Sequence, residues 1–197
     1  QVTEAIKIHQ NLPKKRVMEQ ALDVLRKVNI PAVESRVRDY PHQMSGGMRQ
    51  RVVGAIGISC EPMVLIADEP TTSLDVTIQA QYLKLLRDIQ QESNLALIFV
   101  THDFGIVAKM CDRVAVMYAG KIVELGDVRD IFNHPSHPYT EALLASVPKM
   151  DEDVDRLFSI EGQPPTLHDL PPGCPFAPRC QYVMDQCRQE YPPQVNR

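Results

Sequence analysis

The chain has 197 residues, of which 44% are apolar and 23% are charged, and its formal net charge is −4. This apolar content excludes general disorder, and the acidic balance gives no reason to expect nucleic acid as a partner. The longest apolar runs span only a few residues, whereas a membrane-spanning helix needs roughly 20, so we expect no such helix.

Between Lys14 and Val100, apolar residues recur either at helical spacing or in short uninterrupted runs. The helical spacing predicts amphipathic helices, and the runs, apolar on both faces, are typical of buried parallel strands. The first helix ends before Pro31, because proline disfavours helix at the residue that precedes it. In this part of the chain we expect helices over 14–28, 48–59 and 76–91 and buried strands over 62–67 and 95–100.

Shorter elements continue the pattern beyond Val100. We expect a helix over 104–110, a strand over 113–118, a turn at Ala119-Gly120, an antiparallel strand over 121–124 and a helix with Tyr139, Leu143 and Leu144. The alternation predicts an α/β fold with an open, mostly parallel sheet. In such sheets, functional side chains gather at the carboxyl ends of the strands.

The last quarter of the chain differs in composition. It holds nine of the 16 prolines, from Pro148 onward, and three of the five cysteines. This shift predicts a boundary near Pro148, followed by a loop-rich tail. Because five is an odd number, internal disulfides cannot pair every cysteine, and we expect cytosolic thiols that are free or bound to metal.

Polar side chains follow both predicted parallel strands. Asp68 and Glu69 end the first, where Asp68 could hold Mg²⁺ and Glu69 could polarise a water for attack on a phosphate. His102 follows the second strand and could reach the same phosphate. Taken singly, the acids could equally belong to a solvated acidic loop, and the histidine could be structural.

Ser45, Gly46 and Gly47 directly precede the helix expected to start at Met48. Glycines let a ligand approach the backbone closely, and a helix start offers free amides to an anion. The alternative is a serine N-cap followed by flexible glycines.

In this order, three stretches resemble the ABC ATPase family. Gln43–Arg51 is similar to its signature motif, Leu65–Asp75 to Walker B with the D-loop, and Val100–Asp103 to the H-loop. The resemblance implies a P-loop (RecA-like) ABC ATPase fold. It divides the chain into a helical signature subdomain over 1–60, the C-terminal part of the ATPase core over 61–147 and a small C-terminal extension over 148–197.

The resemblance also implies residue roles, with ATP and Mg²⁺ as ligands. Asp68 would hold Mg²⁺ through water, Glu69 would be the catalytic base, and His102 would contact the γ-phosphate. The expected contacts to a nucleotide bound mainly by the opposite subunit are made by Ser45, Gly46, Gly47 and Met48, with Asp75 at the dimer seam.

Two departures from the family pattern matter. The signature has Met44 and Met48 where leucine and glutamine are usual, and the 197 residues contain no G-x-x-x-x-G-K-S/T phosphate loop. We therefore expect the C-terminal part of a longer subunit, and we expect these residues alone to hydrolyse little or no ATP.

Residues 117–126 and 134–140 resemble the peptide and nickel importer branch. His134 and His137 could be metal ligands, but a proline-stiffened loop is the better interpretation.

The cysteines of the tail resemble the extension of this branch, which can carry a 4Fe–4S cluster with a fourth cysteine further on. The three candidate ligands are Cys174, Cys180 and Cys187. The alternative is three free cysteines in a docking segment. Cys60 and Cys111 lie within the predicted core pattern, and we expect them to be buried thiols.

The function that these resemblances imply is an ATPase that energises an importer of dipeptides, oligopeptides or nickel. The implied partners are a second ATPase subunit, identical or not, integral membrane permeases and, indirectly, an external solute-binding protein, with the chain peripheral at the cytoplasmic face of the inner membrane. One alternative is the head of a DNA-repair or chromosome ATPase, disfavoured by the acidic balance and the absence of heptads. The other is a non-enzymatic metal or redox module built on the tail cysteines.

Overall fold

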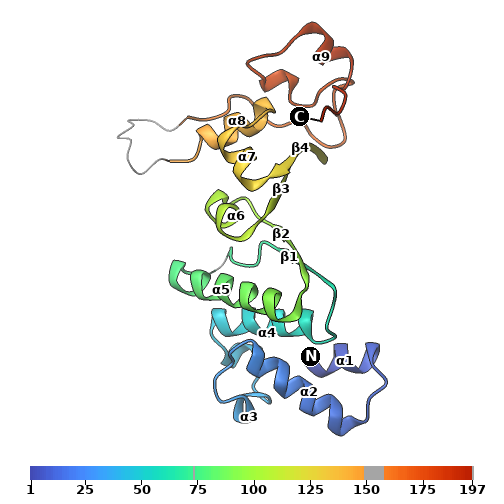
Figure 1. Cartoon of the computed structure of the whole chain (residues 1–197), viewed down its shortest axis with the longest axis vertical. Helices are drawn as coiled ribbons and strands as arrows, with labels where there is room; N and C mark the ends of the chain where they lie inside the picture. The colour runs from blue at the N-terminus through green and yellow to red at the C-terminus, as the bar shows by residue number, and fades with distance from the viewer. Residues whose placement is uncertain (73, 149–157, 197) are drawn as a thin grey trace. The chain divides into compact units, whose positions relative to one another are not determined.

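A computed structural model describes residues 1–72, 74–148 and 158–196 of the chain (Figure 1). The chain divides into two compact units, Gln1–His102 and Asp103–Arg197. Each unit has its own helices and its own two-stranded sheet. The sequence predicts three segments with boundaries after residues 60 and 147. That division stays a prediction, because the two compact units meet at a different position, between His102 and Asp103.

The first unit is mainly helical at its amino end. Its helices are α1 (Val2–His9), α2 (Lys14–Lys27), α3 (Val33–Arg36), η1 (Pro41–Gln43), α4 (Gly46–Ile58) and α5 (Val76–Ser93). The prediction of α2 is confirmed, and the helix buries Val17, Ala21 and Leu25. It ends because Asn29 takes a left-handed φ of 57°, a conformation that asparagine tolerates better than most residues.

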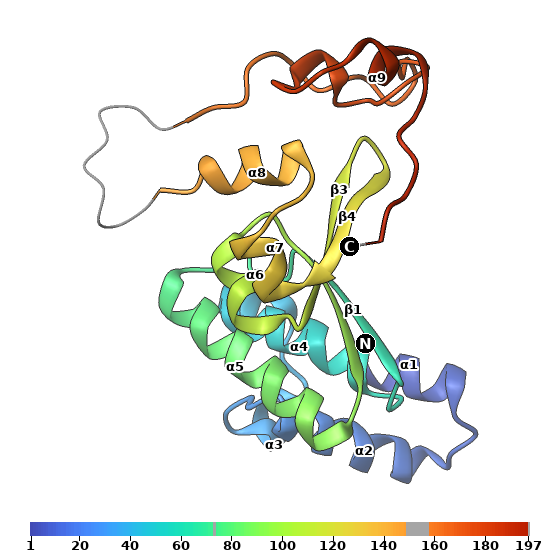
Figure 2. The same cartoon turned by 45° about the horizontal axis from the view of Figure 1, so that its top comes forward.

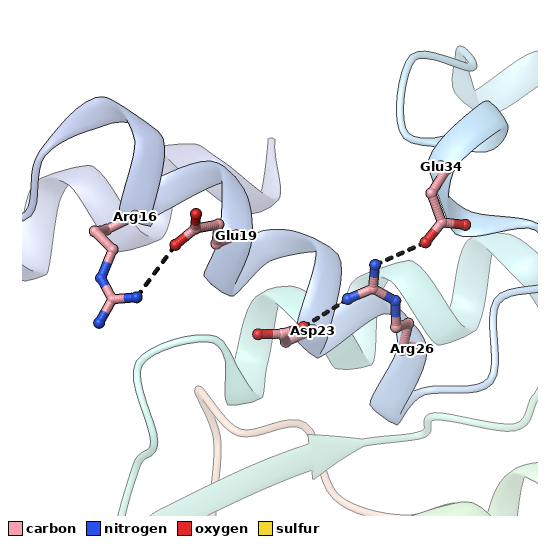
Figure 3. Close-up of polar contacts among 5 residues, drawn as sticks. All are labelled: Arg16, Glu19, Asp23, Arg26 and Glu34. Atoms are coloured by element: carbon pink, nitrogen blue, oxygen red, sulfur yellow. Dashed lines mark hydrogen bonds and ion pairs between the residues drawn. The ribbon is translucent and has the colours of Figure 1, made fainter.

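Arg26 links α2 to α3 on the surface, as Figure 3 shows. Its guanidinium lies 2.6 Å from a carboxylate oxygen of Asp23 and 2.7 Å from one of Glu34. These charge-assisted contacts raise the pKa of Arg26 and lower that of Glu34. Because all three side chains are exposed, the pairs orient α3 more than they stabilise the unit.

Strands β1 (Val64–Asp68) and β2 (Ala96–Val100) pair in parallel, with Ile66 opposite Ile98, which confirms the predicted parallel arrangement. The expected burial of both strands is wrong for one face, where Ile66 is 66% and Ile98 52% exposed. On the other face Leu65 packs close to Gly57 of α4. In the described part of the chain, helices therefore cover only one face of this pair.

The second unit contains a β-hairpin with short helices before and after it in the chain (Figure 2). Its elements are α6 (Phe104–Met110), β3 (Arg113–Tyr118), β4 (Lys121–Asp127), α7 (Val128–Asn133), α8 (Pro138–Ala145), η2 (Ala177–Arg179) and α9 (Asp185–Gln189). The hairpin turn is where the sequence predicts it, with positive φ at both Ala119 and Gly120, as tight hairpin turns require. The described strands thus form two separate two-stranded sheets.

The core of the second unit joins the hairpin to the tail. Tyr118 of β3 packs against Tyr139 of α8 and against Phe176 of the tail, with ring centroids 4.6 and 5.3 Å apart. Arg179 donates to the backbone oxygens of Ile160 and Glu161 and to the Tyr118 hydroxyl. Residues 158–196 therefore include a segment packed on the hairpin.

Two further expectations concern cysteines and membrane spans. Cys60 and Cys111 are half-buried, not fully buried as expected, because each lies near the end of a helix. Of the helices described, none combines the length and the apolar character that crossing a bilayer requires.

His137 has a structural role in the described unit. Its Nδ1 accepts a hydrogen bond from the amide of Tyr139 at 3.0 Å and caps α8. The Glu124 carboxylate accepts hydrogen bonds from the amides of Ser136 and His137. These contacts support a structural role for His137 in the loop before α8, instead of a role as a metal ligand.

We predict that the stability of this unit depends on the protonation of His137. Burial lowers the pKa of His137, and the charge of Glu124 opposes this effect. As the pH falls, His137 is therefore protonated in the unfolded chain before it is protonated in the folded one. The contribution of neutral His137 to the free energy of unfolding is fully present above the ordinary histidine pKa of about 6.5 and declines as the pH falls below that value. Thermal melts from pH 8 to 5 should show a steeper loss for the wild type than for His137→Asn, which keeps a capping side chain. Parallel curves for the two proteins would contradict the prediction.

Candidate functional site

Glu69 and His102 come together where β1 and β2 end. Glu69 Oε1 lies 3.0 Å from His102 Nδ1, although 33 residues separate them along the chain. The parallel register, with Asp68 opposite Val100, brings the two strand ends to one edge of the sheet. The geometry therefore joins two side chains that the sequence predicts at this edge.

A sharp turn of the backbone presents the Glu69 side chain. The amide of Glu69 still donates to Val100 O at 2.9 Å, as a ladder residue would. Its φ of 41° then takes the chain out of the strand, and Pro70 follows. Such a conformation is uncommon for a residue with a side chain and is often found at functional sites.

Two described side chains contact the carboxylate of Glu69. His102 contacts Oε1, and the hydroxyl of Thr72 donates to Oε2 at 2.9 Å. The hydrogen bond with His102 lowers the pKa of Glu69 most, followed by the bond from Thr72. Glu69 is therefore ionised at neutral pH, and its carboxylate oxygens accept hydrogen bonds.

The contact with Glu69 also fixes the orientation of the His102 ring. An ionised carboxylate only accepts hydrogen bonds, so Nδ1 must carry the proton in this contact. Nε2 is then the atom that can face a ligand, and the side chain is 76% exposed. To donate to a phosphate oxygen, Nε2 must carry a proton as well.

Asp68 is the last residue of β1 and is exposed at the same strand end. A carboxylate there suits Mg²⁺, which uses one or two carboxylates and leaves other positions to water and phosphate. Among the described residues, no group of three or more histidine, cysteine or acidic side chains could hold a metal ion. The role of Asp68 in holding Mg²⁺ stays a prediction.

The signature stretch forms the start of α4, which begins at Gly46 and not at Met48 as expected. Ser45 is the N-cap, and its hydroxyl oxygen accepts from the Met48 amide at 3.3 Å. The first backbone bond of the helix runs from the Arg49 amide to Ser45 O. The amides of Gly46 and Gly47 thus belong to the first turn, where helical partners are absent and an anion can bind.

The two signature glycines differ in their surroundings. A Cβ on Gly47 would lie 2.7 Å from Ile78 Cγ2 at the start of α5, whereas one on Gly46 would meet no described atom within 4 Å. Packing inside the unit therefore explains glycine at position 47. It does not explain glycine at position 46, where open space would let a ligand approach the backbone.

We predict opposite results for alanine at these two positions. Gly47→Ala should destabilise the chain by about 1–3 kcal/mol, because the β-branched Ile78 cannot swing its Cγ2 away easily. Gly46→Ala should change the free energy of unfolding by less than about 1 kcal/mol. Urea denaturation of both variants measures this difference, and equal midpoints would show that the packing argument is incorrect.

Asp75 has a structural role that the described contacts define. Its Oδ1 accepts from the amides of Thr77 and Ile78 and caps α5. Because Ile78 also packs beside Gly47, the starts of α4 and α5 lie side by side. The place of Asp75 at a dimer seam stays a prediction.

The tail cysteines do not form a metal site in the described part of the chain. All three pack with the aromatic cluster of the second unit, and the Cys174 amide donates to Cys187 O at 2.8 Å. Burial raises the pKa of Cys180, and the thiols of Cys174 and Cys187 add to that effect. The described residues therefore give no support to the predicted cluster.

A cavity of about 320 Å³ lies elsewhere in the first unit. Apolar side chains of α1, α2 and α4 supply much of its lining, and Ser45, Glu69 and His102 are not part of it. Ser45, Glu69 and His102 are all exposed.

Sequence reasoning missed Thr72 as a member of the site. Its signal was the spacing of three residues from Glu69 across a proline, which is the spacing of a turn. In the structure the Thr72 hydroxyl donates a hydrogen bond to Glu69 Oε2 at 2.9 Å.

Two family models match the chain. One, described as "ABC transporter", matches residues 1–72, and the other, described as "Oligopeptide/dipeptide transporter, C-terminal region", matches residues 123–187. The chain is 52% identical over its full length to the dipeptide transport ATP-binding protein DppD of Bacillus subtilis. It is 51% identical over 98% of its length to DppD of Escherichia coli and 46% identical over 98% to the oligopeptide transport protein OppD of Salmonella typhimurium. The chain spans 57% to 59% of the length of these three relatives.

Solved structures are also similar. CbiO1 of Clostridium perfringens, part of the ABC transporter complex CbiONQ, matches with a TM-score of 0.58 and 32% identity, covering 68% of this chain and 51% of that one. A structure described as "an inward-facing conformation of a putative metal-chelate type ABC transporter" matches with a TM-score of 0.62 and 25% identity, covering 73% of this chain and 55% of that one. These likenesses confirm the predicted α/β fold.

Proposed function

The chain belongs to the ATP-binding proteins of ABC transporters, in their oligopeptide and dipeptide branch, and from that premise we propose that it hydrolyses ATP to energise peptide import. The observation that carries this proposal is the Glu69–His102 pair, 3.0 Å apart beside Asp68. The reaction is an in-line transfer of the γ-phosphoryl group to water, which depends mainly on positioning and charge stabilisation.

Glu69 acts as the base that orients and deprotonates the attacking water. His102 holds one carboxylate oxygen through Nδ1 and presents Nε2 to the γ-phosphate. Asp68 would hold Mg²⁺ through a water, and the ion, when bound, would neutralise charge on the phosphates. This combination suits phosphate chemistry because a base, a donor and a metal carboxylate lie at one strand edge.

The start of α4 serves a different nucleotide. Ser45 and the amides of Gly46 and Gly47 bind the γ-phosphate of ATP held mainly by a second ATPase subunit, with Met48 at the same helix start and Asp75 at the seam. The open space beside Gly46 and the exposure of Asp68 and Glu69 support a site that two subunits complete. Whether the partner is identical or different does not alter this geometry.

The wider assembly follows from the branch. Integral membrane permeases are the direct partners, a solute-binding protein is coupled through them, and the chain is peripheral at the cytoplasmic face of the inner membrane. The relatives reported above are named for dipeptide and oligopeptide transport, which favours peptides over nickel as cargo. The described residues give no support to the 4Fe–4S cluster, which stays a prediction for the longer subunit.

A chimeric subunit tests the proposal. It joins the part of Bacillus subtilis DppD that this chain does not match to the whole 197-residue chain, in place of the matching segment. In cells that lack DppD, the chimera should restore dipeptide uptake, and the same chimera with His102→Ala should restore far less. A chimera that assembles with the permeases but restores no uptake would refute the proposal.

We predict that the 197-residue chain by itself turns over ATP at least about 100-fold more slowly than the chimera does. The sequence has no G-x-x-x-x-G-K-S/T loop, and positioning of the phosphates carries most of this reaction. Phosphate release by the two purified proteins measures the difference. Comparable rates would mean that these residues bind ATP by another route.

A further inference from the structure

The Glu69 carboxylate has a limited number of positions for hydrogen bonds. An ionised carboxylate offers about four lone-pair sites. His102 takes one on Oε1, and Thr72 takes one on Oε2. Because each oxygen has a partner among the described side chains, the two contacts hold the plane of the carboxylate from both sides, and the remaining lone pairs can accept from water.

Thr72 is placed by the turn that follows β1. Its amide points back to Glu69 O at 3.4 Å, which closes the turn across Pro70. Thr71, between them, is only 6% exposed and anchors the turn in the unit. A β-branched threonine has few side-chain rotamers, so its hydroxyl needs little ordering to reach Glu69.

We propose that Thr72 is a positioning residue for ATP hydrolysis, whose hydroxyl holds Oε2 of Glu69 so that the free lone pairs face the attacking water. This inference rests on the proposed role of Glu69 as the base. Thr72 touches no reacting atom itself. It acts by restricting the rotation of a carboxylate that the histidine holds from the other side.

The exposed position of Thr72 favours a role in ATP turnover over a role in the stability of the fold. Its side chain is exposed, so water competes for the hydrogen bond, and its removal costs the fold little. Geometry is more sensitive, because small misplacements of a catalytic group can reduce a rate by about 100-fold. Loss of the hydroxyl should therefore affect turnover much more than folding.

The test compares Thr72→Val and Thr72→Ser in the chimeric subunit assembled with its permeases. Thr72→Val keeps the shape and removes the hydroxyl, and should lower kcat about 10-fold while the KM for ATP stays within about twofold. Thr72→Ser keeps the hydroxyl and should restore most of the rate. An unchanged kcat in Thr72→Val, a main effect on KM, or an equal loss in Thr72→Ser would overturn the inference.

A second measurement separates this inference from the proposed function. If Thr72 acts through Glu69, then Thr72→Val should cause no further loss of turnover in a Glu69→Gln background, because both substitutions disable the same catalytic group. Full turnover by Glu69→Gln alone would overturn the proposed role of Glu69 and this inference together. A large loss in Glu69→Gln with none in Thr72→Val would overturn only the inference. Thermal melts of each variant, with Thr72→Ala as a second deletion of the hydroxyl, control for folding.

Discussion

Replacement of Glu69 by glutamine is expected to lower ATP turnover by about 100- to 10,000-fold, the usual contribution of a general base. Glutamine has nearly the same shape and can still accept a hydrogen bond from Thr72. It cannot accept a proton from water at neutral pH, so the loss should fall on kcat. ATP binding, followed by fluorescent nucleotide titration of the chimera, should change by less than about threefold.

Glu61 offers a matched control for this substitution. It is also an exposed glutamate with a left-handed φ, 51° against 41° for Glu69, but it precedes β1 instead of following it. Glu61→Gln should leave turnover at the wild-type level. Equal losses in both variants would mean that the effect comes from charge on the unit and not from a base at the carboxyl end of the strand.

Regular elements with clear apolar periodicity are predictable from this sequence. The bounds of α6 and β3 agree with their predicted ranges, and the parallel pairing of β1 with β2 is confirmed. The sequence does not predict α3, because its four residues are too few to show the apolar periodicity of a helix. The burial of β1 and β2 was predicted wrongly, since an apolar run does not reveal how many faces are covered.

The residues of the candidate site also divide into those that the sequence predicts and those that it does not. Asp68, Glu69 and His102 are predictable because polar residues that end buried strands are unusual and lie at one edge of a sheet. The contact of Thr72 with Glu69 depends on a left-handed φ at a glutamate, which propensity does not predict. Side-chain contacts set by unusual backbone therefore have to come from coordinates.

Gly173 is the position in the tail where a single methyl group should cause the largest loss of structure. A Cβ there would lie 2.2 Å from Cys187 O and 2.7 Å from the carbonyl carbon of Arg188. Both are backbone atoms, so no side-chain rotation can relieve the clash. The amide of the next residue, Cys174, donates to the same Cys187 oxygen, and that bond would be lost as the two segments separate.

Gly173→Ala is therefore expected to cost about 3 kcal/mol or more, at the upper end for overpacking, and to release the tail from the hairpin. Phe176, which packs on Tyr118 only three residues further on, would lose its anchor and become accessible. Limited proteolysis should cut the tail of Gly173→Ala at least 10-fold faster than that of the wild type. Gly126→Ala in β4 is the control, because its Cβ would make an ordinary 3.4 Å contact with Ile131. If the tail of Gly173→Ala resists protease as well as the control does, then the close approach of Gly173 to Cys187 is not what holds the tail in place.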